Sequence, residues 1–256
     1  MTALMDVLQG AIDIDTNIFL FINGMHNTFF DYFMSAYSGK WVWVPMYAAI
    51  WYVMLRNFHW KVTLFCMVGL ALVITIADQT GATLIRPYVE RLRPANLENP
   101  ISDMVHIVNG HRGGRYGFPS CHAANTFGLA FFVWFLFRKR WLTVFMMGWA
   151  LLTCYSRIYL GVHYPGDLIA GTLVGLIAAY IVYRLFLKVS GYKTMKKVPR
   201  YLCSHIGGRI DDSWDIDIFH GDDIAGSELM IYRHHCFPSD VYLVVKCSFA
   251  WWNTVV

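Results

Sequence analysis

The sequence predicts an all-α integral membrane protein: a bundle of five transmembrane helices with interfacial helices at the N-terminus and a small C-terminal tail. Of its 256 residues, 57% are hydrophobic and 15% are charged, whereas ordinary soluble domains carry about 25% charged residues. Five apolar runs also recur along the chain. A soluble helical bundle is the competing fold, but its helices need polar outer faces, which these nearly uncharged runs lack.

Residues 1–39 are expected to form one or two short amphipathic helices along the outer membrane interface. The segment alternates apolar residues with Asp6, Asp13 and Asp15. A sixth span is the alternative, but it places Asp13 and Asp15 in hydrocarbon, which is costly. The segment contains no Lys or Arg and has only short apolar runs, so we do not expect a cleavable signal peptide.

Each of the five apolar runs is expected to cross the bilayer with help from its flanking residues. A spanning helix needs about 20 residues, and weakly polar or snorkelling flanks supply the missing length where a run is shorter. The expected spans are residues 41–57, 62–85, 120–138, 141–157 and 164–188. With the N-terminal segment they form one membrane domain, residues 1–189.

Basic residues between the spans predict the orientation, because Lys and Arg near helix ends favour the cytoplasmic side. They lie between the first two spans, between the third and fourth, and after the fifth. We therefore expect a bacterial inner-membrane protein whose N-terminus, loop 86–119 and loop 158–164 face the periplasm. The long outer loop nevertheless holds five arginines that need a separate explanation: Arg86, Arg91, Arg93, Arg112 and Arg115.

The tail, residues 190–256, is expected to be cytoplasmic and has no predicted role. It is too short to build much of a core alone. Its Cys and His residues fit no standard zinc spacing, and its Asp-rich stretch fits no calcium loop. We expect free cysteines, no metal and no cofactor. A net charge of +4 is too small a surplus to predict a nucleic-acid partner.

The first of three unusual clusters follows the second span. Arg86 and Arg93 are seven residues apart, and Pro94 fixes the turn beside them. Planar guanidinium groups suit paired binding of phosphate oxygens. Contact with lipid head groups explains the same arginines equally well, so this cluster alone leaves both interpretations open.

The second cluster begins the third span and contains Pro119, Ser120, Cys121 and His122. Pro119 fits the first helical position, which leaves the following backbone N–H groups as unpaired donors at a helix N-terminus. Such an end attracts phosphate. An ordinary helix start with a capping side chain is the alternative.

The third cluster joins the fourth and fifth spans and runs from Ser156 and Arg157 to His163, Pro165 and Asp167. Pro165 predicts a helix start that puts Asp167 about one turn after His163, within reach of the imidazole N–H. A nucleophilic imidazole needs one nitrogen held and the other free. A helix-capping hydrogen bond is the alternative. All three clusters fall on one predicted side of the membrane, which favours a single catalytic site.

Taken in order, the patterns R-x6-R-P, P-S-C-H and S-R-x5-H-x3-D resemble the motifs of the type 2 phosphatidic acid phosphatase family. In that family they read K-x6-R-P, P-S-G-H and S-R-x5-H-x3-D, and the resemblance covers about residues 60–185. Arg86 replaces the usual Lys and keeps its charge. Cys121 replaces the usual Gly, and its side chain is expected to narrow the phosphate cradle.

The resemblance implies metal-independent hydrolysis of a phosphomonoester or pyrophosphate through a phosphohistidine. It implies that His163 attacks phosphorus, that Asp167 orients it, and that His122 protonates the leaving oxygen and later activates water. The residues expected to bind the substrate phosphate are Arg86, Arg93, Ser120, Cys121 and Arg157.

The expected partner is an amphiphilic lipid phosphate that reaches the site from the membrane: undecaprenyl diphosphate, phosphatidate or phosphatidylglycerophosphate, or lipid A. Residue types do not choose among these lipids, nor do they predict an oligomeric state. A phosphotransferase that uses the same histidine and a non-enzymatic lipid-phosphate binding or transport protein both remain alternatives. Asp78, within the second span, is expected to pair with a site arginine or a neighbouring helix, since an unpaired carboxylate there is costly.

Overall fold

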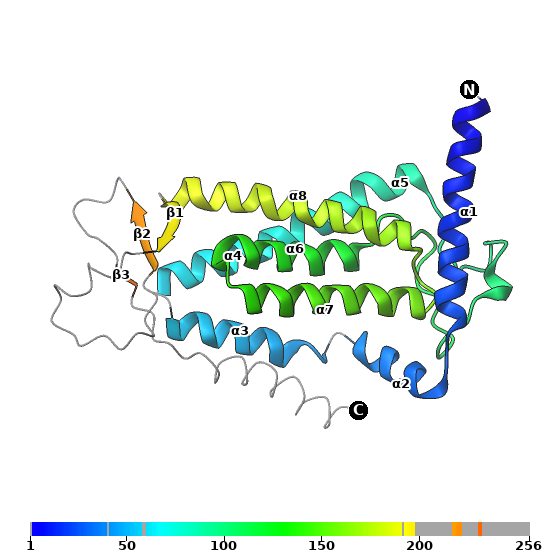
Figure 1. Ribbon diagram of the computed structural model, residues 1–256, viewed down its shortest axis with the longest axis horizontal. Helices are drawn as coiled ribbons and strands as arrows, with labels where there is room; N and C mark the ends of the chain where they lie inside the picture. Colours follow the sequence, from blue (N-terminus) through cyan, green and yellow to red (C-terminus); the bar gives the residue numbers. More distant parts are fainter. Residues whose placement is uncertain are drawn as a thin grey trace. The chain divides into compact units, whose positions relative to one another are not determined.

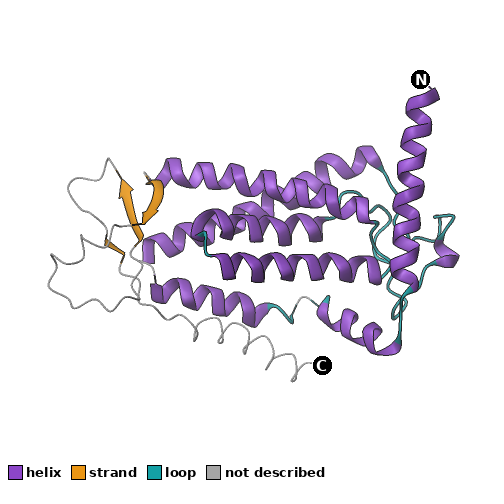
Figure 2. Ribbon diagram, viewed as in Figure 1, coloured by secondary structure: helices purple, strands orange, loops and turns teal. Residues whose placement is uncertain are grey.

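The computed structural model describes residues 2–39, 41–57, 60–190, 192–197, 217–221 and 230–231. Every named element up to residue 190 is a helix (Figure 2), as predicted for the membrane domain. The helices are α1 (Thr2–Gly24), α2 (Thr28–Tyr37), α3 (Val44–Asn57), α4 (Trp60–Gln79), the π-helix η1 (Thr80–Ile85), α5 (Arg86–Val89), the 3-10 helix η2 (Ser102–Met104), α6 (Cys121–Phe137), α7 (Arg140–Tyr159) and α8 (Pro165–Ser190).

In the described parts of the tail, three short strands follow α8, a feature that the sequence did not predict. They are β1 (Tyr192–Lys197), β2 (Asp217–Gly221) and β3 (Met230–Ile231), and they form an antiparallel sheet in the order β1-β2-β3. The tail residues with side chains suited to zinc, Cys203, His205, His235 and Cys236, lie outside the described residues. Of the Asp-rich stretch, Asp217 is described and lies on β2.

The chain divides into two compact units. One comprises Met1–Gly39 and Leu70–Ile181, and the other comprises Lys40–Gly69 and Val182–Val256. All three predicted clusters belong to the first unit. In the second unit, the Thr63 hydroxyl donates a hydrogen bond of 3.2 Å to the Met54 carbonyl, which joins α4 to α3.

Among the described residues, two helical segments are long and apolar enough to cross a membrane: Thr63–Val89, which runs from α4 through α5, and Pro165–Val189 of α8. The third predicted span corresponds to the shorter apolar helix α6. The first and fourth predicted spans fall on α3 and α7. The coincidence of predicted spans with helices supports the order of elements, whereas the count of five spans stays a prediction.

Small residues bring α8 against the beginning of α6. A side chain at Gly171 would collide with the backbone carbonyl of Ser120, and one at Gly175 would collide with that of Ala124. Glycines at four-residue spacing let helix backbones approach closely. This approach fixes the first turn of α8, which carries Asp167, beside the N-terminus of α6.

Helix α1 runs crosswise to α6 and α7 in Figure 1 and docks through a narrow stripe. Phe19 and Asn23 are fully buried in that stripe. The Asn23 side chain donates to the Tyr159 carbonyl at 2.8 Å and accepts from the His106 N–H at 2.8 Å. Elsewhere α1 exposes apolar side chains, which include Leu8, Ile12, Ile14, Ile18 and Phe21. The position of α1 at the membrane interface stays a prediction.

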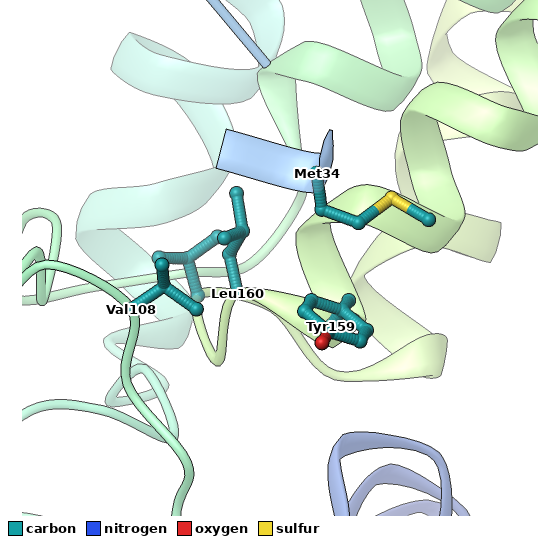
Figure 3. Packing of buried hydrophobic residues seen from close by; sticks show 5 residues of the cluster. Met34, Val108, Tyr159 and Leu160 are labelled. Carbon is teal, nitrogen blue, oxygen red and sulfur yellow. The ribbon is translucent and has the colours of Figure 1, made fainter. Parts of the chain in front are cut away.

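A hydrophobic cluster secures the loop between α7 and α8 (Figure 3). It joins Met34 of α2 and Val108 of the outer loop to Tyr159, Leu160 and Val162 at the end of α7. Since all five side chains are buried, they hold the segment that leads into His163 in one position.

Candidate active site

The centre of the site is the pair predicted from the third cluster, His163 and Asp167. Helix α8 begins at Pro165 as expected, and the Nδ1 atom of His163 lies 3.3 Å from the Oδ2 atom of Asp167. Both side chains are buried, with 1% and 0% of their surface exposed. Because the carboxylate accepts at Nδ1, the Nε2 atom keeps its lone pair for attack.

The outer loop covers this pair closely at Gly117. A Cβ atom at that position would lie 2.9 Å from Asp167 Oδ2 and 3.5 Å from His163 Nδ1. The Gly117 N–H donates to the Arg91 carbonyl at 2.9 Å, which ties the two ends of the loop together. Glycine is therefore required here by close approach, a role that the sequence pattern did not reveal.

Each of the three predicted arginines donates a hydrogen bond from one side-chain nitrogen to a backbone carbonyl. Arg86 Nη2 donates to the Pro119 carbonyl at 3.1 Å, Arg93 Nε to the Tyr116 carbonyl at 3.1 Å, and Arg157 Nη2 to the Ser38 carbonyl at 3.3 Å. The Nε atoms of Arg86 and Arg157 are buried and have no hydrogen-bond partner among the described residues. Anchored guanidinium groups with unused donors are suited to binding an anion.

The positive groups converge on the two histidines. Arg157, His163, Arg93 and Arg86 all lie close enough to His122 to act on it electrostatically. Burial lowers the pKa of His163, and Arg93 and Arg157 lower it further, against the opposing effect of Asp167. Burial and the neighbouring charge of Arg86 also lower the pKa of Arg93. The site therefore holds more positive than negative charge, which favours the binding of a dianion such as phosphate.

His122 differs from His163 in its exposure. It lies in the first turn of α6, and its side chain is exposed. A ring at this position is accessible to substrate and to water, whereas His163 is enclosed by protein. The difference suits two separate roles, a proton donor and acceptor at the edge and a held nucleophile inside.

The start of α6 corrects one prediction. Pro119 precedes the helix instead of occupying its first position, and Ser120 is the N-cap, accepting from the Ala123 N–H at 3.4 Å. The Ser120 N–H, expected to be free, donates to the Asp167 carbonyl at 3.0 Å because α8 packs against it. The helix-end donors therefore begin one residue later, at Cys121 and His122.

Cys121, which replaces the glycine usual in the family motif, lies against Arg86 and η1, and its effect on phosphate binding stays a prediction. Its Sγ atom accepts a 3.1 Å hydrogen bond from Arg86 Nη2 and lies close enough to Asp78 to interact with it. Asp78 therefore lies beside a neighbouring helix, α6, as expected. A Cβ atom at Gly81 would lie 3.3 Å from the Sγ atom, so the thiol fills space against η1. Cys66, Cys121 and Cys154 are free thiols.

Two residues beside the His163–Asp167 pair, Arg91 and Asp15, were not predicted from the sequence. Arg91 Nη1 donates to Asp167 Oδ1 at 3.0 Å, and its Nη2 donates to Asp15 Oδ2 at 2.7 Å. Each partner lies 76 residues away along the chain, so no local pattern could reveal the pairing. Arg112 is likewise explained by structure, since it donates to the Ala95 carbonyl and the Ser102 hydroxyl.

Comparison with known proteins finds a family model and relatives that match this chain. The model of the PAP2 superfamily matches residues 60–190. A lipid A 4'-phosphatase from Bacteroides thetaiotaomicron is 58% identical over 177 residues, covering 69% of this chain and 79% of that protein. A lipid A 4'-phosphatase from Porphyromonas gingivalis is 36% identical over 180 residues, covering 70% of this chain and 76% of that protein.

A solved structure shares the fold. The crystal structure of LpxE from Aquifex aeolicus matches with a TM-score of 0.52 at 23% sequence identity. The match covers 66% of this chain and 94% of that one. The helical arrangement around the site is therefore similar to that of a protein solved by experiment.

Proposed function

We propose that this chain, which belongs to the PAP2 superfamily and is a membrane lipid phosphatase, removes the 4′-phosphate of lipid A through a phosphohistidine on His163. The observation that carries the substrate is the 58% identity to a lipid A 4'-phosphatase across 79% of that protein's length. The observation that supports the mechanism is the buried His163–Asp167 pair beside the arginine cluster.

In the first step, His163 Nε2 forms a bond to phosphorus and the ester P–O bond breaks. Asp167 stabilises the ring as it gains positive charge, since its Oδ2 atom faces Nδ1 at 3.3 Å. His122 donates a proton to the departing sugar oxygen. Arg86, Arg93 and Arg157 neutralise the three equatorial oxygens, where charge is spread in the transition state.

In the second step, water attacks the phosphohistidine. His122, now neutral, takes a proton from that water, the P–N bond breaks, and inorganic phosphate leaves. His163 returns to its neutral form and His122 to its protonated form, so the cycle closes. The main-chain N–H groups of Cys121 and His122 supplement the arginines. Ser120 contributes by capping α6 and keeping these N–H groups in place.

The membrane arrangement forms part of the proposal. We place the site at the periplasmic face, with five spans and a cytoplasmic C-terminus, on the strength of loop charge. A cysteine introduced at the exposed Leu97 of the outer loop should react with a membrane-impermeant maleimide in spheroplasts. A cysteine introduced at the exposed Arg138, on the opposite side, should react only after lysis. The reverse pattern would invert the topology.

The activity is tested with the purified full chain in detergent, with EDTA present. We expect release of phosphate from lipid A, identified as the 4′-phosphate by mass spectrometry, and little from undecaprenyl diphosphate, phosphatidate or phosphatidylglycerophosphate. His163→Ala should reduce the rate at least about 10³-fold. An alkaline quench during turnover should trap phosphate on the parent protein and none on the variant.

Each other outcome selects a different function. Faster release from undecaprenyl diphosphate would reassign the substrate within the same chemistry. Phosphate transfer to an added lipid without free phosphate would identify a phosphotransferase. Lipid A binding by a folded protein with no turnover would identify a binding or transport protein.

A further inference from the structure

We infer that Asp15 of α1 and Arg91 of the outer loop are positioning residues for the His163–Asp167 pair, so that α1 is part of the active site. The inference rests on the proposed nucleophilic role of His163. Asp15 lies well outside residues 60–190, which the family model matches. The catalytic unit of this chain is therefore larger than the matched segment.

Both carboxylate oxygens of Asp15 accept hydrogen bonds from groups beside the His163–Asp167 pair. Oδ2 accepts from Arg91 Nη2 at 2.7 Å, and Oδ1 accepts from the Gly166 N–H at 2.7 Å. Gly166 lies in the first turn of α8, immediately before Asp167. The first N–H groups of a helix have no partner within the helix, so Asp15 caps α8 from outside it and fixes the turn that carries Asp167.

Arg91 completes a continuous chain to the nucleophile. Its Nη1 atom is 3.0 Å from Asp167 Oδ1, while Asp167 Oδ2 faces His163. The guanidinium also lies over the Tyr164 ring, 3.9 Å from its centroid. With one oxygen held by Arg91 and the other shared by His163 and the Tyr164 N–H at 3.1 Å, the buried Asp167 carboxylate cannot rotate freely.

The fit around Asp15 is specific. A Cβ atom at Gly166 would lie 2.8 Å from Asp15 Oδ2, so only glycine lets the carboxylate approach the helix. Phe19, one turn further along α1, meets the Tyr164 ring edge-on at 5.3 Å between centroids. Asp13 points elsewhere, because it is exposed and accepts from Gln9 on the same helix. Asp13 is therefore a matched control.

The charges of Asp15 and Arg91 should also affect the pKa of His163. His163 is faced by Asp167 from α8, by Arg93 from the outer loop, by Arg157 from α7 and by His122 from α6. The positive charge of Arg91 partly neutralises Asp167, and the negative charge of Asp15 partly neutralises Arg91. Removing the Asp15 charge leaves the site more positive and should lower the pKa of His163. Removing the Arg91 charge should raise it.

The test compares Asp15→Asn, Asp13→Asn, Arg91→Met and Arg91→Lys with the parent in the lipid phosphate assay. Asp15→Asn keeps an oxygen for the Gly166 N–H and so preserves the helix cap. We expect it to lower kcat by about 10-fold to 100-fold, the range of small misplacements of reacting groups, with KM changed less than 3-fold. Asp13→Asn should match the parent, and Arg91→Lys should recover part of the loss in Arg91→Met.

The acid limb of the kcat/KM profile provides the readout that a purely structural role would not move. It should shift to lower pH in Asp15→Asn and to higher pH in Arg91→Met. An active parent with Asp15→Asn indistinguishable from Asp13→Asn would overturn the inference. The inference would also be overturned if the acid limbs of Asp15→Asn and Arg91→Met shifted in the same direction. Equal losses of kcat that are explained by lower thermal unfolding temperatures alone would overturn it too. A parent that releases no phosphate would instead count against the proposed function.

Discussion

Asp167 Oδ2 lies 3.3 Å from His163 Nδ1 while Asp167 Oδ1 lies 3.0 Å from Arg91. One carboxylate therefore contacts the His163 ring and is itself held by Arg91 of the outer loop. The loop after α7, the first turn of α8 and the loop after α5 meet at this residue. These segments supply His163, Asp167 and Arg91, and the position of each side chain depends on its contacts with the others.

Asp167→Asn is expected to leave the fold nearly intact and to reduce kcat about 10²-fold to 10⁴-fold. The amide has nearly the same shape as the carboxylate, but it cannot stabilise the positive ring that forms when His163 is phosphorylated. Phosphate release under saturating substrate measures the loss, and circular dichroism in detergent checks the fold. A variant with more than half of the parent kcat would remove Asp167 from the mechanism.

His163 should remain neutral at pH values below the ordinary histidine pKa of about 6.5. Burial and the nearby arginines lower its pKa, so the imidazole is available for attack in mildly acidic solution. Nitrogen-15 NMR of histidine-labelled protein, with His163→Gln for assignment, measures the titration directly. A midpoint above pH 6.5 would contradict the role given to burial.

The same pKa shift predicts an effect on stability. Below pH 6.5 the unfolded chain binds a proton at this histidine before the folded chain does, so the folded state loses stability as pH falls. The unfolding temperature of the parent in detergent should therefore drop more steeply between pH 6.5 and pH 5 than that of His163→Gln. Parallel curves would show that His163 does not drive the loss.

Arg86→Met should lower kcat/KM about 10-fold to 100-fold, the usual cost of a lost hydrogen bond to a charged group. Arg86→Lys, which restores the residue usual in the family, should retain most activity because it keeps the charge. Its KM is expected to rise, since Lys cannot also reach the Pro119 carbonyl and Cys121 Sγ as Arg86 does. Equal kinetics of Met and Lys variants would exclude a charge-based role.

Gly117→Ala should reduce activity about 10-fold or more without preventing folding. The added methyl would lie 2.9 Å from Asp167 Oδ2, so the loop or the carboxylate must shift. Gly114→Ala in the same loop is the control, because a Cβ atom there meets nothing within 4 Å. Phosphate release by the two variants is compared after their unfolding temperatures have been shown to be equal. Similar rates would show that the close approach is dispensable.

Local patterns predicted the helices and the contact between His163 and Asp167. Apolar runs predicted helices where α3, α4, α6, α7 and α8 lie, because a bilayer demands long uncharged segments. Pro165 predicted the start of α8, and the four-residue spacing of His163 and Asp167 around that start predicted their contact.

The N-terminus of α6 shows where local patterns fail. Proline is favoured in the first turn of a helix, which led to the expectation that Pro119 begins α6. The packing of α8 decides otherwise, because the Asp167 carbonyl takes the Ser120 N–H and the Ser120 side chain takes over as the cap. Which donors face the substrate depends on a neighbouring helix that the local sequence does not contain.

The sequence by itself determined the helical elements and the motifs that hold the histidines, the aspartate and the arginines, because hydrophobicity and short-range spacing act within one turn or one span. Only the tertiary structure decided that Asp15 of α1 reaches Gly166 and Arg91, and that Arg91 reaches Asp167. Those contacts join residues far apart in the chain, and their energy exists only once helix packing has brought the partners within hydrogen-bond distance.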